Sequence, residues 1–282
     1  MLERWRARLL ARFVSWMSRD GPQTEMPLVD FACLRREVKP ADVLLVQGHS
    51  RVSGAIQSVT HSSWSHAALY AGRLGELESE TLRAELMDER GWGPEEQLLV
   101  ESDIGRGTVI VSVAKYHDHH VRICRPAGLS PEDAVLVVRH MVQRLGTPYD
   151  LRQILDLLRL LLPFSVLPRR WRSTLFDFKA GSFTRAVCSS MIAEAFASVR
   201  YPILPVVQPG SNGTYLFRRR NHRHFTPRDF DQSPYFSIIK YPFLDGNDIH
   251  LYREMPWDEI GVVCNDPNDC FRLPEMSKIE EP

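Results

Sequence analysis

The stretch SSWSHAALYAG, residues 62–72, places a serine and a histidine directly before an apolar run that ends in Ala-Gly. Short apolar runs bounded by glycine are typical of buried β-strands, and His66 would stand at the first position of this one. A core strand gains nothing from a titratable ring there. A reacting site does gain, because the strand holds the ring rigidly at the edge of the core. His66 is therefore a candidate site residue if the chain supplies partners for it.

The composition is that of an ordinary globular protein. The chain has 282 residues, of which 44% are hydrophobic and 25% are charged, a length that suffices for one large domain or two small ones. The 35 Lys and Arg residues balance 35 Asp and Glu residues, so no overall field favours nucleic acid or an acidic substrate. Five cysteines are few and odd in number, which argues against a disulfide framework and favours a reducing, cytoplasmic location.

Short apolar runs in the middle of the chain predict a β-sheet. Strands are expected at 41–48, 66–72, 98–103, 107–113 and 121–127. The links between the later strands are too short for helical crossovers, so we expect an antiparallel or mixed sheet.

Helical patterns lie on both sides of these strands. Two clear helices are expected over 130–146 and 183–199, and a short one over 53–61 with Ser53 as its N-cap. The segment 73–97 is charged and interrupted by glycines, which predicts an exposed, partly helical insertion. The fold class that follows is α+β, with the sheet packed against helices.

The first 20 residues predict an amphipathic helix. Apolar and Trp residues recur at helical spacing, with arginines mostly on the other side. Its apolar face packs on the domain, or else the helix lies on a membrane surface; the sequence leaves both open. No signal peptide or transmembrane helix is expected. The most apolar segment, 151–168, contains charged residues and is broken by Pro163.

Cys188 lies in RAVCSSMIAEAF, at or near the start of the helix expected over 183–199. Unpaired backbone N–H groups and the macrodipole at a helix start favour a thiolate over a thiol, and the same groups can stabilise an oxyanion. The alternative is a buried structural cysteine, since free Cys packs like a small hydrophobe. Cys188 is therefore a candidate nucleophile.

A nucleophile and a base need a third group that orients the imidazole. Glu101 ends the apolar strand LLVESD, which follows the His66 strand in sequence. Neighbouring antiparallel strands could place its carboxylate beside the ring. Asp103 is the competing choice, because it lies two residues on and so shares a face of the strand.

Two groups of potential metal ligands are better explained without a metal. Cys264 and Cys270 lie in a polar tail without a second pair at ligand spacing, which favours incidental residues over a disulfide or a metal site. The histidines of HDHH, residues 117–120, fall in an expected turn, which favours a solvated loop. We expect no metal and no organic cofactor.

Five segments together resemble a known family. They are the run from DVLLVQG through SHAALYAG, then LLVESDIGRGTVIVSV, GTPYD, AVCSSMIAEAF and FTPRDFDQSPYFSII. This pattern is similar to that of the YiiX/YebB-like permuted papain-fold hydrolases, relatives of the NlpC cell-wall peptidases. In the permuted group the histidine strand precedes the cysteine helix, which is the order here. The resemblance covers roughly residues 38–240.

The resemblance implies a circularly permuted papain-like, NlpC-like fold and assigns roles to single residues. Cys188 would be the nucleophile, His66 the general base and Glu101 the orienting group. Tyr149 of GTPYD resembles the tyrosine that lines the family's site, and Ser65 and Ser189 would stand in the substrate pocket beside it.

The expected domain division places an amphipathic helix and linker at 1–30, the hydrolase domain at 31–245 and an extension at 246–282. The insertion at 73–97, the N-terminal helix and the tail depart from the simplest family members and leave substrate and location open.

The implied activity is acyl transfer to water or another acceptor through a thioacyl-enzyme intermediate. The substrate is an amide of a peptide or isopeptide, or an ester or thioester such as an acyl lipid. No nucleic-acid partner is expected, residues 1–20 are the candidate for peripheral membrane contact, and the oligomeric state stays undetermined. The alternative is a catalytically idle papain-like scaffold that binds peptide or lipid.

Overall fold

The computed structural model describes residues 30–103, 106–147, 187–210, 214–240, 262–266 and 269–272. The N-terminal helix, the apolar segment 151–168 and Tyr149 lie outside these ranges. The chain forms two compact units, residues 1–243 and 244–282, which are described separately.

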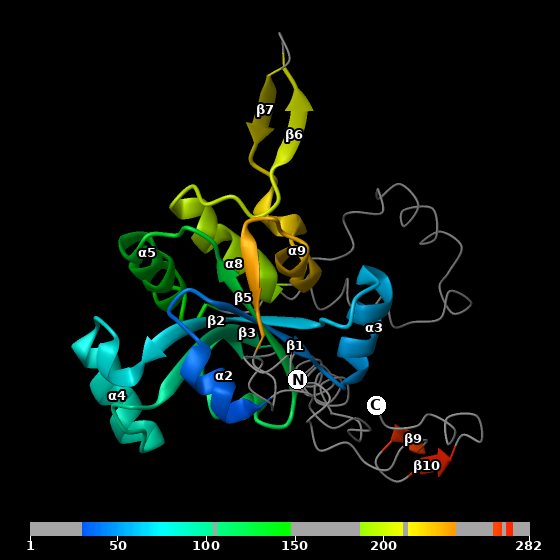
Figure 1. The fold of residues 1–282 in the computed structure, drawn as a ribbon. Helices are drawn as coiled ribbons and strands as arrows, with labels where there is room; N and C mark the ends of the chain where they lie inside the picture. The colour runs from blue at the N-terminus through cyan, green and yellow to red at the C-terminus, as the bar shows by residue number, and fades with distance from the viewer. Residues whose placement is uncertain are drawn as a thin grey trace, which may run out of the picture. The chain divides into compact units, whose positions relative to one another are not determined.

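The first unit is built on a six-stranded sheet (Figure 1). All of its neighbouring strands are antiparallel, in the spatial order β4-β3-β2-β1-β5-β8. The expected α+β class with an antiparallel sheet is confirmed. In chain order the strands are β1 (Val43–Gln47), β2 (His66–Arg73), β3 (Gln97–Asp103), β4 (Gly107–Ser112), β5 (His120–Pro126) and β8 (Phe236–Ile239).

Apolar side chains cover both faces of the sheet, because alternate residues of each strand point to opposite sides. One face packs against four helices: α4 (Glu80–Arg90), α5 (Pro131–Val142), α8 (Val187–Ser198) and α9 (Pro227–Asp231). The other face is covered by α2 (Phe31–Glu37) and the 3-10 helix η2 (Val113–Tyr116). The central strands β1, β2 and β3 are consequently buried over most of their length.

A short helix, α3 (Arg51–Thr60), connects β1 to β2. Its N-cap is Ser50, whose hydroxyl accepts the backbone N–H of Ser53. The cap therefore lies three residues before the expected one, and Ser53 belongs to the first turn. The helix ends at His61 in the left-handed conformation. This short connection delivers the chain directly to His66.

A second, two-stranded sheet stands apart from the first. It is a hairpin of β6 (Val206–Pro209) and β7 (Tyr215–Arg218), and it projects from the unit beyond α8 (Figure 1). Every residue of both strands is exposed. The short 3-10 helix η6 (His222–His224) leads from it to α9.

The described part of the second unit is one hairpin, β9 (Val262–Asp266) and β10 (Asp269–Arg272). Cys270 is disulfide-bonded, and the strand register sets Cys264 opposite it. The expectation that Cys270 is incidental is therefore wrong, because it forms a disulfide.

No helix within the described ranges is both long and apolar enough to span a bilayer.

Candidate active site

The sheet opens between β2 and β3 at the ends that carry the predicted site residues. β2 pairs with β1 as far as His66, and β3 pairs with β4 as far as Asp103. The ladder between β2 and β3 nevertheless ends at the pair Leu69–Val100. Beyond this pair the backbones of β2 and β3 are not paired with each other. Side chains at these strand ends can therefore reach across the gap between them.

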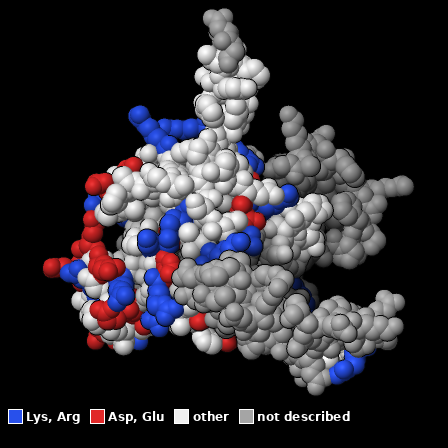
Figure 2. All heavy atoms as spheres, in the orientation of Figure 1, with Lys and Arg blue, Asp and Glu red and all other residues white. Residues whose placement is uncertain are grey.

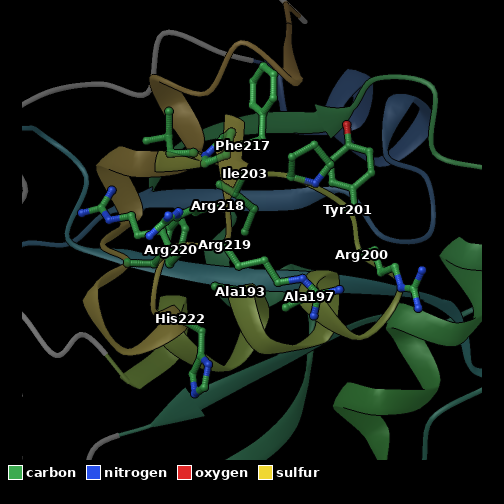
Figure 3. Close-up of a pocket in the computed structure, with 14 residues that line it drawn as sticks. Ala193, Ala197, Arg200, Tyr201, Ile203, Phe217, Arg218, Arg219, Arg220 and His222 are labelled. Atoms are coloured by element: carbon green, nitrogen blue, oxygen red, sulfur yellow. The ribbon is translucent and has the colours of Figure 1, made fainter. Parts of the chain in front are cut away.

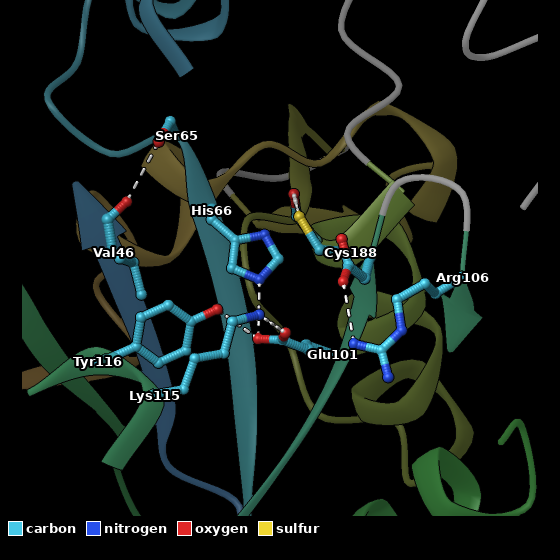
Figure 4. Close-up of polar contacts among 10 residues, drawn as sticks. Val46, Ser65, His66, Glu101, Arg106, Lys115, Tyr116 and Cys188 are labelled. Atoms are coloured by element: carbon cyan, nitrogen blue, oxygen red, sulfur yellow. Dashed lines mark hydrogen bonds and ion pairs between the residues drawn. The ribbon is translucent and has the colours of Figure 1, made fainter. Parts of the chain in front are cut away.

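His66 and Glu101 meet across this opening (Figure 4). The Nε2 atom of His66 lies 3.1 Å from Oε2 of Glu101. The Glu101 side chain is completely buried, whereas that of His66 keeps 24% of its surface exposed. One edge of the His66 ring is therefore bound to a buried carboxylate, and another part of the ring remains accessible to solvent.

Two further donors hold the same carboxylate. The Tyr116 hydroxyl donates to Oε2 of Glu101 at 2.5 Å, and the Lys115 ammonium forms an ion pair with Oε1. Burial alone would raise the pKa of Glu101, but the hydrogen bond and charge of His66, together with Lys115, lower it to about 2. Burial and the adjacent carboxylate raise the pKa of Tyr116 well above its ordinary value, so the hydroxyl keeps its proton and donates.

Cys188 is the second residue of α8, and its side chain is buried, with 7% of the residue exposed. The sulfur of Cys188 lies 3.9 Å from the hydroxyl oxygen of Ser189. Figure 4 shows the Cys188 side chain next to the imidazole ring of His66. The three predicted residues thus form one contiguous set.

The charges of this set favour an ion pair. Burial would raise the pKa of Cys188, yet the charge and hydrogen bond of His66 lower it below the ordinary 9.0. Burial would likewise lower the pKa of His66, but the Cys188 thiolate and then Glu101 raise it from 6.5 to about 10. The lowered pKa of Cys188 and the raised pKa of His66 both favour a thiolate next to an imidazolium, and the thiolate is the nucleophilic form of a cysteine.

The other sequence-predicted residues have different surroundings. Asp103 does not meet the ring; its carboxylate lies 3.7 Å from the Arg106 guanidinium. The Ser65 hydroxyl accepts the backbone N–H of Gly48 and donates to the carbonyl of Val46, so it joins β1 to β2 and does not point at the sulfur (Figure 4). Ser189 is buried beside the sulfur.

Lys115 and Tyr116 contact the candidate site through Glu101, and the sequence did not predict either residue. They lie on η2, within the link from β4 to β5. These strands are not neighbours in the sheet, so the link must cross β3, β2 and β1, and this crossing brings both side chains over Glu101. The sequence contains only one hint of them. Glu101 ends an apolar strand, and a carboxylate that becomes buried there requires hydrogen-bond donors.

The histidines of residues 117–120 have different surroundings in the structure. In the part of the chain that the structure describes, no group of three His, Cys, Asp or Glu side chains is arranged to hold a metal ion. His117 is exposed, as a solvated loop requires, but His120 begins β5 and stacks on Trp64 with ring centroids 5.6 Å apart.

Comparisons with known proteins add little to this geometry. No family model matches the sequence, and no curated protein matches it. Among solved structures the chain is similar to yiiX from Escherichia coli O157:H7, described as a metalloprotein, with 15% identity and a TM-score of 0.42. The match covers 73% of this chain and 98% of that one. A likeness at this level carries no argument about activity, so the chemistry of the site is inferred from its own residues.

Proposed function

We propose that the protein is a cysteine hydrolase or acyltransferase that acts on an amide, ester or thioester through Cys188, His66 and Glu101. The observation that carries this proposal is the arrangement of three side chains: a thiol at the start of α8, a histidine ring next to it (Figure 4), and a buried carboxylate 3.1 Å from the ring. The order of the elements, with the histidine strand before the cysteine helix, also supports a circularly permuted papain-like fold.

The reaction proceeds in two acyl-transfer steps. The Cys188 thiolate attacks the carbonyl carbon and forms a C–S bond, while the carbonyl electrons become an oxyanion that backbone N–H groups of the first turn of α8 stabilise. The imidazolium of His66 then gives its proton to the leaving amine or alcohol as the bond to it breaks. Glu101 stabilises the imidazolium throughout.

The second step returns the enzyme to its starting state. Neutral His66 takes a proton from water, and the resulting hydroxide attacks the thioester of Cys188. The C–S bond breaks, the acid is released and the thiolate and imidazolium re-form. With an alcohol or amine in place of water the same steps give acyl transfer. The substrate is a peptide, another amide or an acyl lipid.

Alkylation with iodoacetamide at mildly acidic pH tests the proposal, because the chain supplies its own controls. Burial and nearby Asp231 raise the pKa of Cys124 to about 12, and burial and Asp30 raise that of Cys33. Peptide mapping should therefore find the label on Cys188 and not on these two. His66→Gln should abolish this selectivity. Uniform, slow labelling of all thiols in the native protein would instead support an idle scaffold.

The substrate class needs a second experiment. Probes that carry an acyl electrophile or a peptidyl electrophile should be compared at equal concentration, with the adduct mapped to its residue. A Cys188 adduct from one class identifies the bond the enzyme attacks. Absence of a Cys188 adduct from either, with the thiol still alkylated by iodoacetamide, would mean that the site does not accept these carbonyls and would overturn the hydrolase proposal.

A further inference from the structure

The β6–β7 hairpin exposes an unusual amount of apolar surface. Tyr215 is 70% exposed, Phe217 59% and Leu216 49%, and Val206 and Val207 of the other strand are also exposed. Neither strand packs a face against the domain. A two-stranded hairpin of this kind is marginally stable at best in water, and exposed apolar patches mark interaction sites.

The apolar side chains follow the strand register. The pairs Val207–Phe217 and Pro209–Tyr215 share one face, which is apolar throughout. The other face holds Gln208–Leu216 and Val206–Arg218, so apolar groups occur there too. A protein groove covers one side of a hairpin. Surroundings that are apolar on every side, as in the upper part of a lipid leaflet, accommodate both faces.

Positive charge gathers at the base of the hairpin. Arg218 ends β7, Arg219 follows it, and Arg200 lies in the loop after α8; all three line a cavity of about 170 Å³ with Ala193, Ala197 and Phe217 (Figure 3). Figure 2 shows Lys and Arg atoms beside the foot of the white, projecting hairpin.

These arginines are free to meet an external anion. Within the described ranges, no Asp or Glu forms an ion pair with Arg218 or Arg219. Arg220 differs, because it pairs with Asp229 at 2.9 Å and lies over the Phe225 ring. The hairpin thus presents aromatic groups along its length and unpaired guanidinium groups where it joins the domain.

We propose that this hairpin docks the protein on a bilayer that contains anionic lipid. Its aromatic and aliphatic side chains enter the interface, and Arg218 and Arg219 contact the phosphate headgroups. The proposal goes beyond the proposed acyl-transfer chemistry and does not depend on it, nor on residues 1–20.

Flotation of the full chain with vesicles tests it. We expect the protein to float with vesicles of equal parts phosphatidylcholine and phosphatidylglycerol, and far less with phosphatidylcholine alone. Tyr215→Ser with Phe217→Ser should weaken binding roughly tenfold to a hundredfold, because two large side chains no longer leave water. Arg219→Glu should weaken it roughly tenfold, and added salt should reduce this difference.

Two matched variants control for composition. Val135→Ser with Leu136→Ser removes apolar groups of similar exposure from α5. Arg90→Glu makes the same charge change on α4. Neither should alter flotation. Circular dichroism should show that all variants keep the fold, since every altered side chain is exposed.

Three results would overturn the proposal. The wild-type chain fails to float with anionic vesicles, which would leave a protein partner as the occupant of the hairpin. The hairpin variants float as well as the wild type, which would place binding elsewhere in the chain. Sedimentation shows that the wild type is a dimer and that the Tyr215→Ser, Phe217→Ser variant is a monomer, while neither binds vesicles. This result would place the hairpin between two copies of the chain.

Discussion

Glu101 has no exposed surface and accepts from three side chains. A hydrogen bond to a charged, buried group contributes about 1.5–3 kcal/mol, more than one between neutral groups. Tyr116→Phe should therefore lower the free energy of unfolding by about 1.5–3 kcal/mol.

Urea denaturation measures this loss, and Tyr70→Phe is the matched control. Tyr70 is also buried, and within the described ranges its hydroxyl accepts from the neutral amide of Gln97 at 3.1 Å. Its loss should cost about 0.5–1.5 kcal/mol. Equal losses at the two tyrosines would show that the charge on Glu101 is not what makes the Tyr116 bond strong.

The three central residues differ in what their removal should do to turnover of an acyl or peptidyl probe. Cys188→Ala should abolish it with the fold intact. His66→Ala should cost nearly as much, because nucleophile and base act as a unit. Glu101→Gln should cost less, since Glu101 touches the ring and not the substrate. Full turnover by Cys188→Ala would require another nucleophile.

The reactivity of Cys188 should depend on pH in a direction set by His66. Its pKa lies below the ordinary 9.0 because the imidazolium outweighs burial. The midpoint of the alkylation rate against pH should therefore fall below 9.0 in the wild type. In His66→Gln only burial remains of the two main effects, so the midpoint should move to 9.0 or higher. An unchanged midpoint would show that His66 does not stabilise the thiolate.

Among the elements, the turn after β1 depends on a glycine. A Cβ added at Gly48 would lie 2.3 Å from Ser53 Oγ and 2.9 Å from Ser65 Oγ, both on short side chains. Gly48→Ala should destabilise the fold by about 1–3 kcal/mol, as overpacking does. The added methyl group should also displace Ser65, and with it the neighbouring His66. Alkylation of Cys188 should therefore become slower.

Gly54 is the control for this change. It lies inside α3 with nothing within 4 Å of an added Cβ. Gly54→Ala should raise stability by about 0.5–1 kcal/mol, because alanine loses less backbone entropy in a helix. Urea denaturation of both variants separates crowding from backbone entropy, and a stabilising Gly48→Ala would contradict the turn geometry.

The elements with clear local patterns were predictable from the sequence. The β1 to β5 ranges match the expected strands within about two residues, and α5 begins at Pro131 with Ser130 as its cap. The β6–β7 hairpin was missed because its exposed strands lack polar alternation. Lys115 and Tyr116 were missed because their contacts depend on strand order, which no local pattern encodes. The papain-like relation remains a proposal.

For the molecule as a whole, the ion pair links stability to pH. His66 has a raised pKa, so its contribution is full below 6.5 and is lost as pH rises through about 10. Cys188 has a lowered pKa, so its contribution is full above 9.0 and is lost as pH falls through its folded value. Above 9.0 only the folded state still holds a proton of the pair, so stability must fall with rising pH.

The measurement is the unfolding free energy of the wild type minus that of Cys188→Ala with His66→Gln, recorded across pH. The double variant lacks both titrating groups, so the pH-dependent contributions of all other residues cancel in the difference. The difference should decline between pH 9.0 and about 10. A difference that rises in this interval would mean that the folded protein does not hold His66 protonated.

The distance along the chain between β2 and α8 has a consequence for biosynthesis. His66 and Glu101 leave the ribosome well before Cys188, and the strands that carry them are neighbours in sequence. A long-range contact forms late, because the loop between its ends must first be closed. Until α8 docks, the Cys188 thiol keeps an ordinary pKa and is mostly protonated at neutral pH. The nascent chain therefore carries a weakly reactive thiol, and full reactivity begins only when α8 has docked beside β2.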